Sequence, residues 1–334
     1  MFSSLLLFIY YFWGVDFKLN FPIQPLDKKI SYRHKILLAG SCFAENIGAM
    51  MDKYAFHAHT NPNGITYNPH SIAVMLQRLM AGNAYTEDDL FLYNELWSSW
   101  QHHGSFSNTD KISCLERINK EFTKAQNCLQ TGNWLIITFG SAYVYTLKNT
   151  GEKVANCHKY PNKEFDKILL QPADIIAQWQ QAIQQLQTYN PQLNILLTVS
   201  PVRYVRDGLV NNTLSKAILL QAVHSLCNSF ENVNYFPAYE LVMDDLRDYR
   251  FFTEDLVHPN AQAIQYVWEK LIDSAFDDET QSIYPQIKQL YTERQHRPFN
   301  TDTQAYQKFL AAHTSKIQKL KTEYPFIDWK NFLD

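Results

Sequence analysis

Short apolar runs alternate with longer segments of helical periodicity along most of this chain. The runs are KILLA (35–39), WLIITFG (134–140), LNILLTVSP (193–201) and NVNYFP (232–237). Between them, apolar residues recur three and four positions apart, which is typical of helices that cover a core with one face. Strands that alternate with helices form parallel sheets covered on both faces. The pattern therefore predicts an α/β protein whose parallel sheet lies between two layers of helices.

The same patterns predict the main elements and the place where chemistry belongs. We expect helices over 43–54, 110–130, 172–188, 214–230 and 259–276, and a further helix that begins at a capping residue, Ser71. We also expect a short strand over 55–59 and a hairpin that turns at 149–151. Parallel sheets place their sites at the carboxyl ends of the strands. These ends are expected at Gly40, His59, Gly140, Ser200 and Pro237.

The two ends of the chain depart from this pattern. Residues 1–14 are apolar but shorter than the about 20 residues that span a bilayer, and they lack a basic region and a cleavage site. They are interpreted as a weak signal peptide or as an extension from a start codon placed too early. From residue 277 the sequence turns polar and predicts two helices. We expect residues 277–334 to pack on the α/β domain of residues 15–276, since so short a segment builds only a thin core.

The composition argues against several classes of function. The net charge is −3 and no long block of like charge occurs, which disfavours a nucleic-acid partner and a polybasic membrane patch. The five cysteines are odd in number and contain no CxxC pair, which disfavours a disulfide framework and a structural zinc site. We therefore predict reduced thiols in the cytoplasm, no metal, no cofactor and no membrane span.

A serine and a cysteine stand where the first strand must turn into a helix. Gly40 ends the apolar run, and Ser41 and Cys42 follow it directly. A nucleophile in such a turn stands above the sheet, and the helix N-terminus lowers the pKa of a thiol and stabilises an oxyanion. The structural alternative is that Ser41 caps the helix and Cys42 is a small buried residue.

An aspartate and a histidine stand three residues apart just before the last helix of the domain. In EDLVHPN, the carboxylate of Asp255 can curl under a turn and hold Nδ1–H of His258, which frees Nε2 to act as a general base. The spacing alone is common, and the alternative is a helix-capping histidine beside a solvated aspartate. The position after the last predicted strand favours the functional interpretation, because the strand ends meet at one edge.

Several motifs occur in one order along the chain. They are AGSCFAENIG, NPNGITYNPHSI, TFGSAYVY, VANCHKYP, LTVSPVR, SKAILLQA and DLVHPN. Together they resemble the GSCFA-domain family over residues 20–275, and the pairing of GSC with DLVHP is similar to the SGNH (GDSL-like) hydrolases. The resemblance implies a flavodoxin-like three-layer α/β/α sandwich with a parallel sheet, plus a helical C-terminal appendage.

The SGNH pattern also implies roles for single residues. In one register Cys42 falls on the nucleophile, and in the register shifted by one it is Ser41. Asp255 and His258 fall on the acid and the base. The GSAY turn carries alanine where those enzymes have an oxyanion asparagine, so Asn63 or Asn156 would have to replace it unless each is a turn residue. The candidate oxyanion and substrate-binding residues are Gly64, Asn63, Gly140, Ser141, Asn156, His158 and Arg203.

Two of these candidates rest on their own sequence context. His158 follows Cys157, and neighbouring side chains on a strand point to opposite faces, so the two form no obvious pair or metal site. We interpret His158 as a substrate contact. Arg203 follows the end of a predicted strand and either holds an anionic substrate group bidentately or forms a surface ion pair.

These observations predict a hydrolase or an acyltransferase for ester substrates, O-acyl glycans included. Transfer would require an acyl donor such as a thioester, and nothing in the sequence decides between transfer and hydrolysis. The missing oxyanion asparagine supports an alternative from another class. In that alternative the domain has lost catalysis and binds a glycan or a protein partner.

Overall fold

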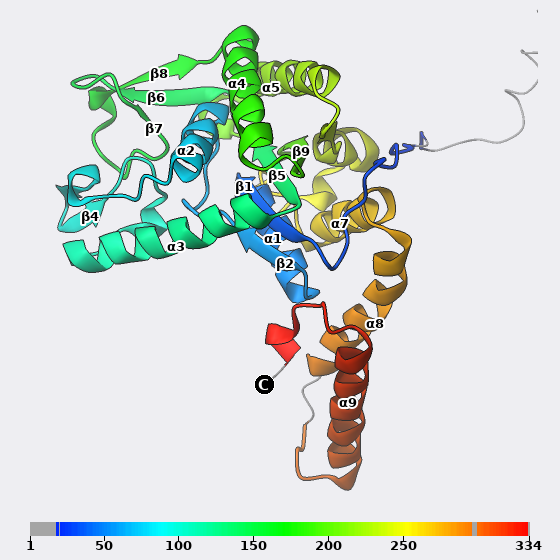
Figure 1. The fold of residues 1–334 in the computed structure, drawn as a ribbon. Helices are drawn as coiled ribbons and strands as arrows, with labels where there is room; N and C mark the ends of the chain where they lie inside the picture. The colour runs from blue at the N-terminus through cyan, green and yellow to red at the C-terminus, as the bar shows by residue number, and fades with distance from the viewer. Residues whose placement is uncertain (1–17, 20, 296–298, 333–334) are drawn as a thin grey trace, which may run out of the picture.

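A parallel sheet of five strands forms the centre of the molecule (Figure 1). The computed structural model describes residues 18, 19, 21–295 and 299–332. The strand order is β2-β1-β5-β9-β10, and all neighbouring strands are parallel. The strands are β1 (Lys35–Gly40), β2 (His57–Thr60), β5 (Trp134–Phe139), β9 (Asn194–Val199) and β10 (Val233–Tyr235). Four of them coincide with the predicted apolar runs, β2 overlaps the short strand predicted over 55–59, and their order is that of a flavodoxin-like sheet.

Side chains that alternate along the strands fill two separate cores. Leu37, Leu135 and Leu197 belong to one core, and Ile36, Ile136 and Leu196 belong to the other. The first core is covered by α2 (Pro69–Ala81), α3 (Lys111–Thr131), α4 (Pro172–Tyr189) and α5 (Leu209–Ser229). The second is covered by α1 (Cys42–Lys53), the short α6 (Ala238–Glu240) and α7 (Ala261–Ala275). This arrangement confirms the predicted three-layer α/β/α sandwich.

Two small antiparallel sheets extend from the sandwich. One joins β6 (Tyr143–Leu147), β7 (Lys153–Val154) and β8 (Phe165–Leu169), so the predicted hairpin is present and gains a third strand. The other joins β3 (Phe91–Tyr93) and β4 (Leu96–Ser98) through a tight turn in which Asn94 and Glu95 both have positive φ. The sequence did not predict β3, β4 and β8 as regular strands.

Two predicted helix starts are wrong. Asn68, and not Ser71, caps α2, because the Asn68 side chain accepts a hydrogen bond from the amide of Ser71 and Pro69 occupies the first turn. Helix α5 also begins five residues before its predicted start of 214. Its buried stripe includes a lysine, Lys216, among aliphatic residues.

The C-terminal segment forms two helices that extend below the sandwich in Figure 1. They are α8 (Asp278–Arg294) and α9 (Gln304–Glu323). Tyr284 of α8 meets Tyr54 edge to face and accepts a hydrogen bond from Trp268 of α7. Helix α8 thus adds to the core on the α1 and α7 side of the sheet.

The predicted N-terminal extension, residues 1–14, lies outside the described residues. Among the helices of the described residues, none has the length and the apolar character that crossing a membrane requires.

Candidate active site

The turn between β1 and α1 depends on Gly40. Its φ is +142°, and a Cβ at this position would collide with the carbonyl group of Thr138 on β5. Any other residue would be strained and would clash, so glycine lets the chain leave the sheet here. The turn places Ser41 and Cys42 at the carboxyl edge of the sheet and at the start of α1.

Ser41 and Cys42 occupy different environments in this turn. Ser41 is 1% exposed, and its Oγ accepts a hydrogen bond of 3.2 Å from the amide of Phe43, which makes Ser41 the helix cap. Cys42 is partly exposed and is the first residue of α1. The cysteine therefore has access to a ligand, whereas the serine hydroxyl is buried and already bonded.

Tyr67 is the polar neighbour of the Cys42 thiol. Its phenol oxygen lies 3.6 Å from Cys42 Sγ. The backbone carbonyl of Tyr67 accepts hydrogen bonds from the amides of Gly140 and Ser141, at 2.8 and 2.9 Å, which fixes the loop between β2 and α2. Burial and the adjacent Cys42 raise the pKa of Tyr67 well above its usual value. The phenol therefore stays protonated near neutral pH and can donate a hydrogen bond.

Asp255 and His258 form the predicted pair. His258 Nδ1 lies 2.7 Å from Asp255 Oδ2, which assigns the proton to Nδ1 and leaves the lone pair on Nε2. The other carboxylate oxygen accepts hydrogen bonds from the Thr253 hydroxyl and from the amides of Val257 and His258. These bonds, of which the one from the Thr253 hydroxyl has the largest effect, hold the pKa of Asp255 well below its usual range. Asp255 is thus ionised and fixed beneath the imidazole.

Arg203 holds the turn that carries this pair. Its amide donates to the carbonyl of Val257 and its guanidinium to the carbonyl of Leu256, both at 3.2 Å. The guanidinium also lies over the rings of Phe252 and Tyr249, with its central carbon 4.1 and 4.9 Å from the ring centres. In the described part of the chain Arg203 therefore contacts the histidine turn, and the structure shows neither of the two roles expected for it.

The acid–base pair and the thiol are not joined. No hydrogen bond connects His258 to Cys42 or Ser41 among the residues that the structure describes. The thiol and the acid–base pair nevertheless lie at the same carboxyl edge of the sheet. Cys42 follows β1, and the turn that carries His258 is held by Arg203, which follows β9. The structure thus assembles the Asp255–His258 pair but not a complete triad.

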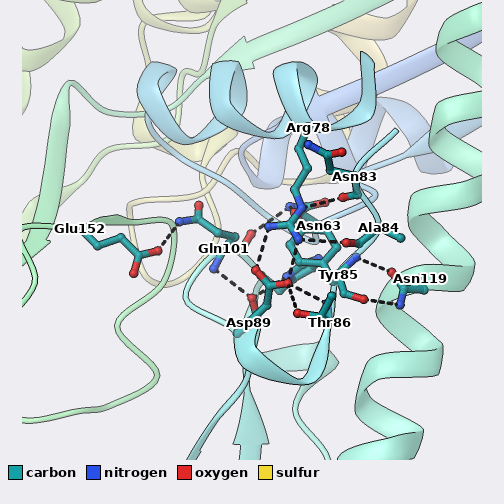
Figure 2. A network of polar contacts seen from close by, with 12 residues as sticks. Asn63, Arg78, Asn83, Ala84, Tyr85, Thr86, Asp89, Gln101, Asn119 and Glu152 are labelled. Carbon is teal, nitrogen blue, oxygen red and sulfur yellow. Dashed lines mark hydrogen bonds and ion pairs between the residues drawn. The ribbon is translucent and has the colours of Figure 1, made fainter. Parts of the chain in front are cut away.

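Two expected oxyanion donors are engaged elsewhere. The amide of Gly64 donates to the carbonyl of Asn61 at 2.7 Å, and φ of Gly64 is +74° in a turn where a Cβ would strike His103. Asn63 is buried, and its amide nitrogen donates to the Tyr85 hydroxyl and to the backbone of Gln101. Figure 2 shows Asn63 within a network that includes the Arg78–Asp89 ion pair and the Gln101–Glu152 hydrogen bond.

A buried lysine fixes the turn at Gly140 and Ser141. The amides of both residues donate to Tyr67, so they are not free either. Lys216 is 1% exposed, and its Nζ donates to the carbonyl of Gly140 at 2.6 Å and to that of Ser200 at 2.7 Å. This clamp ties together the carboxyl ends of β5 and β9. Burial lowers the pKa of Lys216 to about 7.

A pocket of about 590 Å³ opens beside Tyr67 and therefore beside the thiol that Tyr67 contacts. Three predicted site residues, Ser141, Asn156 and His158, line it. Gly64 lines a different pocket of about 470 Å³, together with Glu45 and His103. The first pocket is lined by Tyr67, Asn68, Ser141, Tyr143, Tyr145, Val154, Ala155, Asn156, Cys157, His158, Lys159, Tyr160, Pro161, Asn162, Tyr204 and Arg206.

Sequence reasoning missed Tyr67 and Lys216. Lys216 has a signal in the sequence, because it stands on the apolar stripe of α5 with Leu219 and Val223, three and seven residues later, and a charge on a buried stripe needs a partner. Tyr67 lies in the quoted NPNGITYNP motif, but nothing in that motif shows that its ring reaches the thiol.

Two solved structures resemble the chain at a low level. One is a carbohydrate esterase of family 3 from Talaromyces cellulolyticus, with 9% identity and a TM-score of 0.35, covering 78% of this chain and 99% of that chain. The other is an acetyl xylan esterase from the rumen bacterium Butyrivibrio proteoclasticus, with 10% identity and a TM-score of 0.36, covering 76% of this chain and 64% of that one. Among the curated proteins, none matches this chain.

The family comparison is stronger than the comparison of structures. Residues 35–271 match the GSCFA family, and residues 287–334 match the C-terminal domain of GSCFA domain proteins. The first match covers the whole central sheet, the Gly40–Cys42 turn and the Asp255–His258 pair. The chain therefore belongs to the GSCFA family.

Proposed function

We propose that the protein is a hydrolase that cleaves esters through Cys42, His258 and Asp255. The observation that carries the proposal is the 2.7 Å contact between His258 Nδ1 and Asp255 Oδ2. It orients the imidazole, leaves Nε2 available as a base and stabilises the imidazolium that forms when His258 takes a proton. The further hydrogen bonds to Asp255 hold the pair in one geometry, as general-base catalysis requires.

Cys42 is the better nucleophile of the two candidates. It is partly exposed at a helix N-terminus, where the partial positive charge of the helix favours a thiolate. Ser41 is buried, and its hydroxyl caps the helix. A buried cap must break its hydrogen bond and move before it can attack, whereas the thiol needs only to lose its proton.

The reaction then takes two chemical steps. Cys42 Sγ attacks the acyl carbon while its proton passes to His258 Nε2. The ester C–O bond breaks, the leaving alcohol takes the proton from His258, and a thioester remains on Cys42. Water attacks the thioester and gives its proton to His258. The carboxylic acid leaves, and Cys42 regains its proton.

The oxyanion requires donors other than the expected ones. The first amides of a helix have no partner within the helix, so the start of α1 offers backbone N–H groups beside Sγ. The protonated phenol of Tyr67 lies 3.6 Å from the same sulfur and is a second donor. Together they take the role of Gly64, whose amide is bonded to Asn61.

The proposal requires His258 to approach Cys42 when substrate is bound. The side chains of Asp255 and His258 are 48% and 44% exposed, so the turn that carries them lies at the surface. Catalytic hydrogen bonds are often long in free enzymes and shorten in the complex with substrate.

The alternative function is a binding domain without catalysis. The observation that favours it is that no hydrogen bond links His258 to Cys42 in the described residues, while the amides of Gly64, Gly140 and Ser141 are already bonded. In that case the pocket beside Tyr67 binds a glycan or a partner, and Cys42 has no catalytic role.

The test measures both turnover and covalent labelling. O-acetylated sugars are incubated with the native protein and with the variants Cys42→Ala, His258→Ala and Asp255→Asn, and acetate release is followed. We expect release by the native protein alone, a mass increase of one acetyl group on Cys42, and capture by iodoacetamide rather than by a fluorophosphonate. No release together with slow alkylation at neutral pH would support the binding domain instead.

The same assay separates hydrolysis from transfer. An acyl thioester is supplied with and without a free sugar acceptor, and the products are identified by mass spectrometry. If the thioester on Cys42 passes its acyl group to the sugar in preference to water, the protein is an acyltransferase. Release of the free acid alone supports the hydrolase.

A further inference from the structure

Two cations in the wall of the pocket have no acidic partner. Lys159 and Arg206 both line it, and neither forms an ion pair within the described ranges. No aspartate or glutamate belongs to the lining of this pocket. Lys167, by contrast, lies over the ring of Tyr143 and pairs with Asp207. The pocket therefore presents unneutralised positive charge to a ligand, although the whole chain carries a net charge of −3.

The loop that carries Lys159 is held in an unusual backbone conformation. His158 and Lys159 have φ of 49° and 57°, a left-handed pair that costs free energy for residues with side chains. Asn156 Oδ1 accepts a hydrogen bond from the amide of His158, and His158 Nε2 donates to the carbonyl of Ser99, both at 2.8 Å. Burial lowers the pKa of His158 and keeps its ring neutral. The loop is therefore fixed, and Lys159 is held at the pocket.

Arg206 lines the same pocket and acts on a second thiol there. Its positive charge acts on Cys157, whose pKa burial nevertheless raises to about 11. Cys157 is thus a neutral thiol near pH 7, and it leaves the charge of Arg206 uncompensated. Arg203, three residues earlier, is occupied by the histidine turn, so Arg206 is the arginine that faces the pocket.

The rest of the wall suits a sugar ring. Tyr143, Tyr145 and Tyr204 form an aromatic group around Lys167, whose Nζ lies 4.3, 5.5 and 5.4 Å from their ring centres. The amide side chains of Asn68 and Asn162 also line the pocket. Aromatic faces pack against the apolar face of a sugar, and amides hydrogen-bond its hydroxyl groups.

We propose that the pocket beside Tyr67 selects esters of sugars that carry an anionic group, with Lys159 and Arg206 as the residues that bind the anion. The proposal deepens the proposed ester hydrolysis and rests on it for the role of Cys42. A carboxylate and a sulfate offer the same chemistry to a guanidinium and an ammonium, so the class includes uronic acids and sulfated sugars.

The first test compares matched substrates. O-acetylated methyl galacturonoside, its neutral galactoside counterpart and a sulfated galactoside are hydrolysed by the native protein and by Arg206→Gln and Lys159→Gln. We expect kcat/KM to be at least about tenfold higher for a charged ester than for the neutral one, and each substitution to lower that ratio. Lys163→Gln is the control, because its side chain is 82% exposed and lies outside the pocket lining. Equal kcat/KM for all three esters would overturn the proposal.

The second test does not depend on catalysis. Binding of galacturonate oligomers and of galactose oligomers to Cys42→Ala is measured by calorimetry at low and at moderate salt. Tighter binding of the charged oligomer, if salt and Arg206→Gln both weaken it, supports the anionic class of ligand. This conclusion holds even if no ester is cleaved, and in that case only the proposed hydrolysis fails. Ester cleavage without any preference for charge, in binding or in rate, overturns the anionic class and leaves the hydrolase standing.

Discussion

The sulfur of Cys42 lies 3.6 Å from the phenol oxygen of Tyr67, whose ring lines the pocket. This contact connects the turn after β1 with the pocket that the hairpin of β6 and β7 helps to form. It also gives the thiol a hydrogen-bond donor that the sequence motifs did not indicate. Because Tyr67 stays protonated at neutral pH, it can stabilise negative charge on sulfur and on a nearby oxyanion.

Cys42→Ala and Ser41→Ala should have different consequences. We expect Cys42→Ala to lower ester turnover about a thousandfold or more, because the nucleophile is lost. Ser41→Ala should keep most turnover and lower the free energy of unfolding by about 0.5–2 kcal/mol, the usual effect of removing a helix cap. Acetate release and urea unfolding measure the two effects. Inactive Ser41→Ala with active Cys42→Ala would move the nucleophile to the serine.

Tyr67→Phe removes the donor and keeps the ring. We expect kcat to fall about tenfold to a hundredfold, since one oxyanion donor is lost, with the fold unchanged. Alkylation of Cys42 by iodoacetamide at pH 7 should also slow, because the thiolate loses a hydrogen bond. Tyr306→Phe on α9 serves as the matched control. An unchanged kcat in Tyr67→Phe would exclude the phenol from the reaction.

Arg203→Met tests whether the arginine positions His258 or binds substrate. The substitution keeps an apolar chain over Phe252 and removes the bond to the Leu256 carbonyl. We expect kcat to fall about tenfold to a hundredfold with little change in KM, because the base is less well placed. The NMR signals of the His258 ring should also change, because the turn that carries it loses a hydrogen bond. A rise in KM confined to charged substrates would instead assign the anion contact to Arg203. Arg250→Met is the control, because Arg250 is an exposed arginine that lies over the Phe251 ring and pairs with Asp248.

The sequence predicted the framework well because strands and helices follow from local patterns. Runs such as KILLA and WLIITFG are apolar on both faces, which is required only of strands buried between two helical layers. The short strand β8 was missed, since its burial alternates and its partner β6 lies on the far side of a loop. Asn68 was missed as a cap because Ser71 is itself a common cap residue, although Pro69, which is favoured at the first helical position, marks the start of α2.

In the candidate site, too, the sequence predicted the local contacts and missed the long-range ones. The Asp255–His258 contact spans three residues, so the spacing predicts it. The contacts of Cys42 with Tyr67 and of Lys216 with Gly140 span 25 and 76 residues and depend on the order of the strands. Gly64 and Asn63 matched a motif, but the Gly64 amide is bonded to Asn61 in its own loop, and the Asn63 side chain donates to Tyr85 and Gln101, 22 and 38 residues away. Whether residues 277–334 fold without the sandwich stays a prediction that a fragment of these residues can test.

Lys216→Met gives a prediction about pH and stability. In the folded protein, burial lowers the pKa of Lys216 from 10.5 to about 7. Between these two values the unfolded chain binds a proton that the folded chain does not, so stability from this residue rises with pH. Below pH 7 both states are protonated and the contribution is constant.

The free energy of unfolding of the native protein, minus that of Lys216→Met, should therefore increase from about pH 7 to pH 10, by at most about 1.4 kcal/mol per pH unit. Urea unfolding at a series of pH values measures this difference, and Lys163→Met, at an 82% exposed side chain, should show no such trend. A difference that stays constant from pH 7 to pH 10 would mean that Lys216 remains charged over this range and that its ammonium stabilises the carbonyl groups of Gly140 and Ser200. The clamp between β5 and β9 would then act as a buried cation.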